Sequence, residues 1–125
     1  MSMLSKKLRK WADPASGQEG LTYWCQGCQE AHGIRTKGPG AWTWNGDMER
    51  PVFGPSVLTT GKRKPTEEEW ARIRAGEKLE MPEERCHTFV GCNGAKPGEV
   101  IFLDDCTHGL RGVHPFPDLP DWLQS

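Results

Sequence analysis

The chain has 125 residues, a length that fits one ordinary domain and is too short for two with separate cores. Its 16 basic and 17 acidic side chains give a formal net charge of −1, so it lacks the broad positive field of proteins that coat nucleic acid or anionic membranes. Hydrophobic residues make up only 35% of the chain, while 15 glycines and 10 prolines favour turns. This composition predicts a turn-rich, mainly β (α+β) protein with a thin core.

The N-terminus carries the strongest local charge, from the cations Lys6, Lys7, Arg9 and Lys10. We expect residues 1–20 to form a solvated basic arm, which leaves binding to nucleic acid possible but disfavoured. No apolar run approaches the ~20 residues needed to cross a membrane, and the N-terminus lacks the apolar stretch of a signal peptide. We therefore expect a soluble, intracellular protein with no membrane partner.

The first predicted hairpin contains the motif YWCQGCQEAH. Residues 21–25 and 32–36 have the β-branched and aromatic content of two strands, so Cys25 and Cys28 fall in the turn between them. This spacing is typical of a zinc knuckle. A redox dithiol is a weaker alternative, because that motif opens a helix in a βαβ unit and no such unit precedes it.

Residues 41–61 predict a second hairpin. Trp42 and Trp44 alternate on one face, and the Asn-Gly pair that follows them is a strong hairpin signal. Residues 51–61 then continue as a strand. Their prolines fit an edge or a bulge better than a central position in a sheet.

Residues 65–77 predict one inserted helix. Thr66 and Glu69 have the spacing of a capping box at its N-terminus. Trp70 and Ile73 share a helix face, so we expect the helix to cover one face of the sheet.

Residues 86–90 and 99–103 predict a third hairpin with a glycine-rich loop. Cys86 and His87 are consecutive strand residues and point to opposite faces, so the two cannot easily bind one ion. One of them is therefore expected to serve another task.

The cysteines and histidines gather into groups that predict a metal site. A reducing cell interior disfavours structural disulfides, and structural zinc takes four such ligands, commonly a Cys-x-x-Cys pair plus a distant second pair. Cys25 and Cys28 supply the first pair, and the second comes from four candidates, Cys86, His87, Cys106 and His108. We therefore expect Zn²⁺ to stabilise a single β-rich domain over residues 21–125, built as a small antiparallel sheet or sandwich of hairpins.

An ordered set of motifs resembles one known family over residues 21–122. The motifs are YWCQGCQEAH, WTWNGD, PVFGPSVL, TEEEWARIRAGE, CHTFV, IFLDDCTHGLRG and DLPDW. The chain is similar to small uncharacterised proteins of bacteriophages and prophages, which often carry the labels "ammonia monooxygenase" or "anaerobic dehydrogenase". The resemblance implies a phage protein in the cytoplasm of a bacterial host. The labelled activities do not fit, because the sequence has no transmembrane segment and no dinucleotide-binding fingerprint.

The resemblance also bears on the choice of ligands. Relatives often have a serine at the position of Cys106, which makes His108 the better ligand of that pair. The preferred zinc set is therefore Cys25, Cys28, Cys86 and His108, with His87, Cys106 and His32 in reserve. The choice between Cys86 and His87 stays open. Three thiolates in a closed site indicate a structural ion rather than a catalytic one.

Two classes of function follow from these residues. The first is a non-enzymatic zinc-binding accessory protein that binds a host or phage macromolecule, with a protein as the expected partner and a role in host takeover or anti-defence. The second is a small zinc-dependent hydrolase or nuclease with an open metal position and His87, His32 or Asp105 as general base. We favour the first, because no nucleophile, base and orienting group stand at a recognisable spacing.

Overall fold

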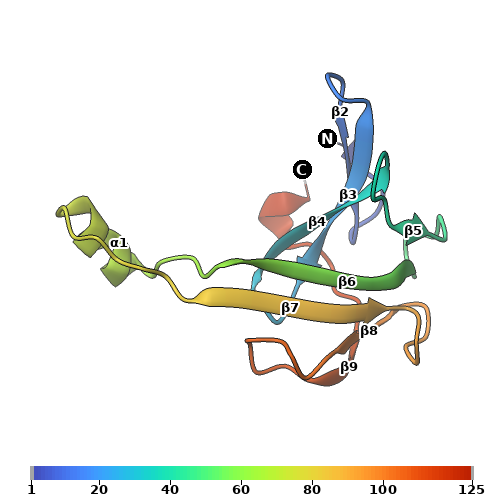
Figure 1. Cartoon of the computed structure of the whole chain (residues 1–125). Coiled ribbons are helices and arrows are strands. Elements are labelled where there is room, and N and C mark those ends of the chain that lie inside the picture. Colours follow the sequence, from blue (N-terminus) through green and yellow to red (C-terminus); the bar gives the residue numbers. More distant parts are fainter. Residues whose placement is uncertain (1, 125) are drawn as a thin grey trace.

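The computed structural model describes residues 2–124, which form two antiparallel β-sheets, one α-helix and one short 3₁₀ helix (Figure 1). The four-stranded sheet has the order β1–β2–β3–β4, with strands β1 (Ser2–Met3), β2 (Arg9–Asp13), β3 (Gln18–Cys25) and β4 (Glu30–Lys37). The five-stranded sheet has the order β5–β6–β7–β8–β9, with strands β5 (Thr43–Trp44), β6 (Phe53–Lys62), β7 (Glu83–Val90), β8 (Glu99–Phe102) and β9 (Gly112–Pro115). The helices are α1 (Glu67–Arg74) and η1 (Asp121–Leu123). The predicted mainly β fold with one inserted helix is confirmed.

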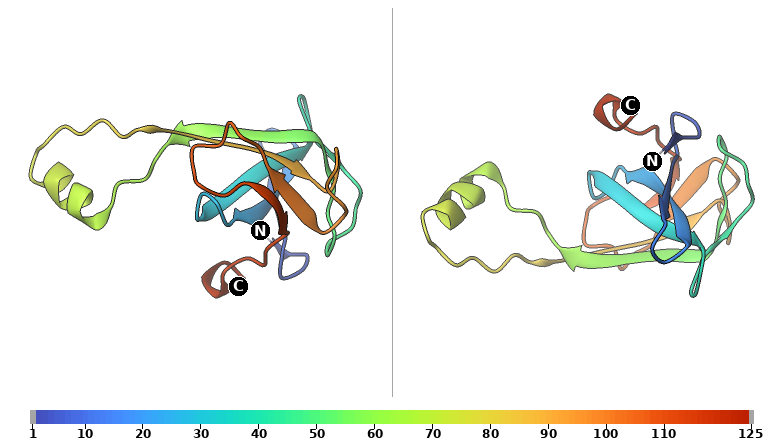
Figure 2. Two further views of the ribbon diagram at one scale, coloured as in Figure 1. Left: turned by 90° about the horizontal axis from the view of Figure 1, so that it is seen from below. Right: turned by 90° about the horizontal axis from the view of Figure 1, so that it is seen from above.

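The core lies between the two sheets, which are stacked in the views of Figure 2. Along β3 and β7, alternate side chains are buried, as expected for strands with one face towards a core. Phe53 of β6 is fully buried, with its ring centroid 5.5 Å from that of Tyr23 in the four-stranded sheet. Phe116, which follows β9, packs 5.6 Å from the same tyrosine ring. Aromatic rings therefore supply much of the contact between the sheets, consistent with the thin core expected from composition.

The N-terminal segment that we expected to be a solvated arm forms β1 and β2 of the four-stranded sheet. Its apolar residues explain the difference, because Leu8 is fully buried in the core between the cations. Trp11 pairs with Gly20 of β3, and a Cβ atom at Gly20 would overlap the Trp11 ring. The absent side chain at Gly20 therefore makes room for the indole.

Helix α1 forms as predicted but does not cover a sheet face. The capping box is present, because Thr66 Oγ1 accepts the Glu69 N–H at 3.2 Å and the Glu69 carboxylate accepts the Thr66 N–H at 2.9 Å. None of the eight residues of α1 is buried, and the helix stands beyond the end of the β6–β7 ribbon (Figures 1 and 2). Within residues 2–124, no helix is long and apolar enough to cross a membrane.

Candidate functional site: a metal-binding cluster and a Ser–His–Asp triad

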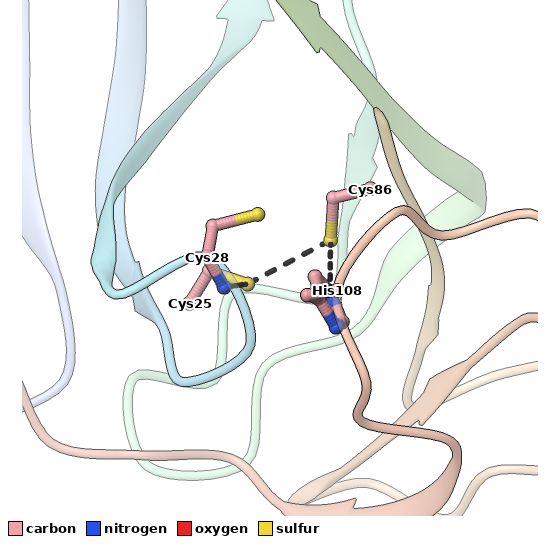
Figure 3. A group of neighbouring side chains, drawn as sticks. All are labelled: Cys25, Cys28, Cys86 and His108. Atoms are coloured by element: carbon pink, nitrogen blue, oxygen red, sulfur yellow. Dashed lines mark hydrogen bonds between the residues drawn. The ribbon is translucent and has the colours of Figure 1, made fainter. Parts of the chain in front are cut away.

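Three cysteines and one histidine meet between the sheets (Figure 3). They are Cys25 at the end of β3, Cys28 in the β3–β4 turn, Cys86 on β7 and His108 in the loop between β8 and β9. Their four candidate ligand atoms all lie within 4.8 Å of one another, and this cluster can hold a metal ion. The structure thus brings together the four residues of the preferred ligand set.

The turn between β3 and β4 has the geometry of a metal knuckle. The Cys28 N–H donates to Cys25 Sγ at 3.4 Å, and the Gln29 N–H donates to the Cys25 carbonyl at 2.9 Å, which closes the turn. Gly27 lies against the imidazole of His108, where a Cβ atom would overlap the ring. A glycine at this position therefore lets the imidazole approach the two cysteines of the knuckle.

The electrostatics of the cluster favour a bound cation. Hydrogen bonds from the Cys28 and Cys86 thiols hold the pKa of Cys25 far below its ordinary value, and the same contacts with Cys25 raise the pKa of Cys28 and of Cys86. Burial lowers the pKa of His108, which favours the neutral imidazole that a metal ion binds. A divalent cation would allow all three thiols to ionise, as metal ligation requires.

His87 lies on the other face of β7 and is the centre of a second constellation. Its Nε2 atom lies 3.3 Å from Ser56 Oγ, and its Nδ1 atom lies 3.1 Å from Asp105 Oδ2. Because a carboxylate only accepts, Nδ1 carries the proton and Nε2 is free to accept the Ser56 hydroxyl. The side chains of His87 and Asp105 are 27% and 43% exposed, so a substrate can reach them. This is the arrangement of a Ser–His–Asp catalytic triad.

A bulge in β6 places Ser56. Phe53 pairs with Val90 and Val57 pairs with Thr88, so β6 advances by four residues where β7 advances by two. Such bulges redirect side chains and are frequent beside active sites. The Trp42 indole N–H donates to the Ser56 carbonyl at 2.7 Å, which fixes the backbone at the bulge.

The loop after β8 places Asp105, and it is tied to β7 by several hydrogen bonds. Cys106 Sγ accepts the His87 N–H at 3.3 Å and donates to the His87 carbonyl at 3.4 Å. The Thr107 N–H donates to the Arg85 carbonyl at 2.9 Å, and the Arg111 guanidinium donates to the Cys106 carbonyl at 2.7 Å. Cys106 therefore contacts the backbone of His87 and is not one of the four clustered ligands.

The remaining reserve ligands also lie outside the cluster. His87 belongs to the triad and not to the cluster, because consecutive strand residues point to opposite faces and Cys86 faces the cluster. His32 on β4 is buried, packs edge-on against Tyr23 and has no hydrogen-bond partner for its Nε2 atom within residues 2–124. It borders the same cavity as Cys28 and Cys86 without joining the group. Ser56 was missed from the sequence, because no local motif marks it as a nucleophile.

The fold and the two sites define a small β protein with a Cys/His cluster that can hold a metal ion on one face of its five-stranded sheet and a Ser–His–Asp arrangement on the other. The family model described as "Bacterial ubiquitination-like system serine protease (BubE)" matches residues 4–96. This match spans most of the chain, and the protein belongs to that family. The matched region contains Ser56 and His87, whereas Asp105 and His108 follow it. No curated protein and no solved structure matches the chain.

Proposed function

We propose that this protein is a serine peptidase of a bacterial ubiquitination-like system, with Ser56 as nucleophile, His87 as general base and Asp105 as the group that orients His87. The observation that carries the proposal is that the two ring nitrogens of His87 reach Ser56 and Asp105 at the same time. The family description names a serine protease, which agrees with this geometry. The proposal departs from the non-enzymatic function that we favoured from the sequence.

The chemistry follows from the positions of the three groups. His87 Nε2 takes the proton of Ser56 Oγ as the oxygen attacks a peptide carbonyl, and Asp105 stabilises the imidazolium that forms. His87 then gives the proton to the departing amine, which leaves an acyl ester on Ser56. Water activated by the same imidazole hydrolyses the ester and frees Ser56 for another cycle.

The metal in this proposal is structural Zn²⁺. A tetrahedral zinc with Zn–S near ~2.3 Å and Zn–N near ~2.0 Å would place sulfur atoms about 3.8 Å apart and sulfur and nitrogen about 3.5 Å apart. The Cys25 and Cys86 sulfurs lie 3.7 Å apart, and His108 Nε2 lies 3.5 Å from Cys86 Sγ. Four protein ligands leave no position for water, so hydrolysis is better supported at Ser56 than at the metal.

The two sites use the same two chain segments. Strand β7 supplies Cys86 to the cluster and His87 to the triad, and the loop after β8 supplies His108 to the cluster and Asp105 to the triad. A bound ion would therefore fix the segments from which two triad residues project. The phage origin, the host cytoplasm and a role in takeover or anti-defence remain predictions from the resemblance.

The test is the hydrolysis of p-nitrophenyl acetate under pre-steady-state conditions. We expect a burst of nitrophenol of about one equivalent per chain, followed by slower turnover, because the ester acylates Ser56. Ser56→Ala should abolish the burst, whereas Ser16→Ala, a change at an exposed turn serine, should retain it. A burst that survives in Ser56→Ala would contradict the proposal.

A further inference from the structure

Strand β6 has an open edge that begins beside the nucleophile. Its neighbour β5 pairs only with Phe53 and Gly54, whereas β7 pairs with β6 as far as Lys62. Within residues 2–124, the stretch from Leu58 to Lys62 therefore has a strand partner on one side only. An unpaired edge of this kind is a template for another extended chain.

The hydrogen bonds of β7 show which backbone groups face that edge. His87 is opposite Leu58. Its backbone N–H donates to Cys106 Sγ and its carbonyl accepts the Leu103 N–H, and both partners lie on the β8 side. Arg85 is opposite Thr60 and bonds in the same way to Thr107. Opposed residues of an antiparallel pair alternate between bonded and non-bonded pairs, so Leu58 and Thr60 direct their N–H and carbonyl groups away from β7.

The same edge leads directly to the nucleophile. The Ser56 carbonyl also points away from β7, since it accepts the Trp42 indole N–H. Beyond Ser56 the edge is occupied by Trp42 and β5. The free backbone groups thus start two residues after Ser56 and continue away from it along β6.

We propose that this edge binds the substrate as an extended polypeptide, which adds a strand beside β6 through Leu58 and Thr60 and presents its scissile carbonyl to Ser56. This inference rests on the proposed peptidase function and adds the conformation of the substrate. Main-chain hydrogen bonds supply the affinity in strand addition, and alternate side chains supply the specificity. Leu58, which is 49% exposed and points to the face of Ser56 and His87, is the side chain placed to contact the substrate.

The test removes one backbone donor from the edge. Thr60→Pro deletes the outward N–H, and proline is tolerated on edge strands when its nitrogen faces solvent. Val113→Pro is the matched control, because Val113 is 55% exposed on the edge strand β9. Phe89 lies two residues after His87 and, like it, directs its backbone N–H and carbonyl towards β8, where it is opposite Ile101. Ile101 therefore directs its own N–H and carbonyl towards β7. The N–H and carbonyl of Val113, which is opposite Ile101, thus point away from β8, as those of Thr60 point away from β7.

Two measurements on each purified protein separate binding from chemistry. The first is cleavage of a tryptic peptide library from a bacterial proteome, followed by mass spectrometry. The second is labelling of Ser56 by a small fluorophosphonate, which needs the triad but no strand pairing. We expect Thr60→Pro to cleave peptides up to about tenfold more slowly than wild type, the effect of one lost hydrogen bond, and Val113→Pro to cleave at the wild-type rate. Labelling of Ser56 should proceed in all three proteins.

Three results would overturn the inference. Undiminished peptide cleavage by Thr60→Pro would show that the edge does not bind substrate. A labelled wild-type protein that cleaves no peptide would show that extended polypeptides are not its substrates. A dimer of the wild type that Thr60→Pro dissociates would assign the edge to a second copy of the chain. Absence of labelling at Ser56 in the wild type would instead remove the proposed function, and the inference with it.

Discussion

The stability of the fold should depend strongly on Cys86, which lies on β7, and weakly on Cys92, which follows the same strand. Cys86 lies in the Cys/His cluster that can hold a metal ion and is separated from Cys25 by 61 residues and from His108 by 22. A link that closes a 61-residue loop lowers the free energy of the folded state by about 4 kcal/mol relative to the unfolded chain, by chain-entropy estimates. Cys86→Ser removes that link, so it should lower the free energy of unfolding by a similar amount.

Cys92 is the control for the chemical change itself. Its sulfur lies 3.5 Å from the carbonyls of Phe53 and Pro55, outside the cluster, so Cys92→Ser should cost less than about 1 kcal/mol. The assay is thermal unfolding by circular dichroism, with zinc per chain measured by elemental analysis. Each kcal/mol corresponds to a shift of roughly 3–5 °C for a chain of this size, so Cys86→Ser should melt more than about 10 °C below wild type. Equal melting temperatures for the two variants, with zinc retained in both, would show that Cys86 does not stabilise the fold through a bound ion.

The remaining predictions concern the triad and its connection to the metal. Asp105→Asn should keep the fold and lower the rate of p-nitrophenyl acetate acylation by about 10³–10⁴-fold, because the amide favours the wrong tautomer of His87; an unchanged rate would remove Asp105 from the triad. Gly27→Ala should weaken zinc binding at least about tenfold in a chelator competition, because its Cβ would displace His108, whereas Gly33→Ala, whose nearest neighbour would be 3.8 Å away, should not. Removal of zinc with 1,10-phenanthroline should slow fluorophosphonate labelling of Ser56 in wild type, since His108 and Asp105 share one loop; labelling at full rate in the metal-free protein would show that the two sites are independent.

Only part of the Cys/His cluster could be predicted from local sequence, because Cys86 and His108 come from distant segments of the chain. The Cys-x-x-Cys spacing places two sulfurs in one turn, and strand alternation assigns Cys86 and His87 to different faces. The prediction that one of these two residues serves another task agrees with the structure, where Cys86 joins the cluster and His87 contacts Ser56 and Asp105.

The triad could not be predicted in the same way. Ser56 and His87 are 31 residues apart, and Asp105 follows 18 residues later. A triad is recognised by geometry rather than by chain order, and the order Ser–His–Asp differs from those of chymotrypsin, subtilisin and the α/β-hydrolases. The bulge that places Ser56 depends on the pairing of β6 with β7, which no local pattern specifies.

Two further differences have physical causes. The cations of residues 6–10 suggested a solvated arm, but burial of Leu8 anchors this segment to the core. Trp70 and Ile73 suggested a helix that covers a sheet, but the long β6–β7 ribbon carries α1 beyond the core. The capping box and the Arg63–Glu69 and Arg72–Glu77 ion pairs support α1 locally.

The proposed peptidase function requires that Ser56 is a nucleophile activated by His87. Its most direct test is peptide mapping by mass spectrometry after treatment with a fluorophosphonate, which forms a covalent bond only with an activated serine. We expect one adduct on the peptide that contains Ser56, and none in His87→Gln, whose thermal stability should remain close to that of the wild type. An adduct on another serine, or a Ser56 adduct that forms equally fast in His87→Gln, would show that His87 does not activate Ser56 as the nucleophile.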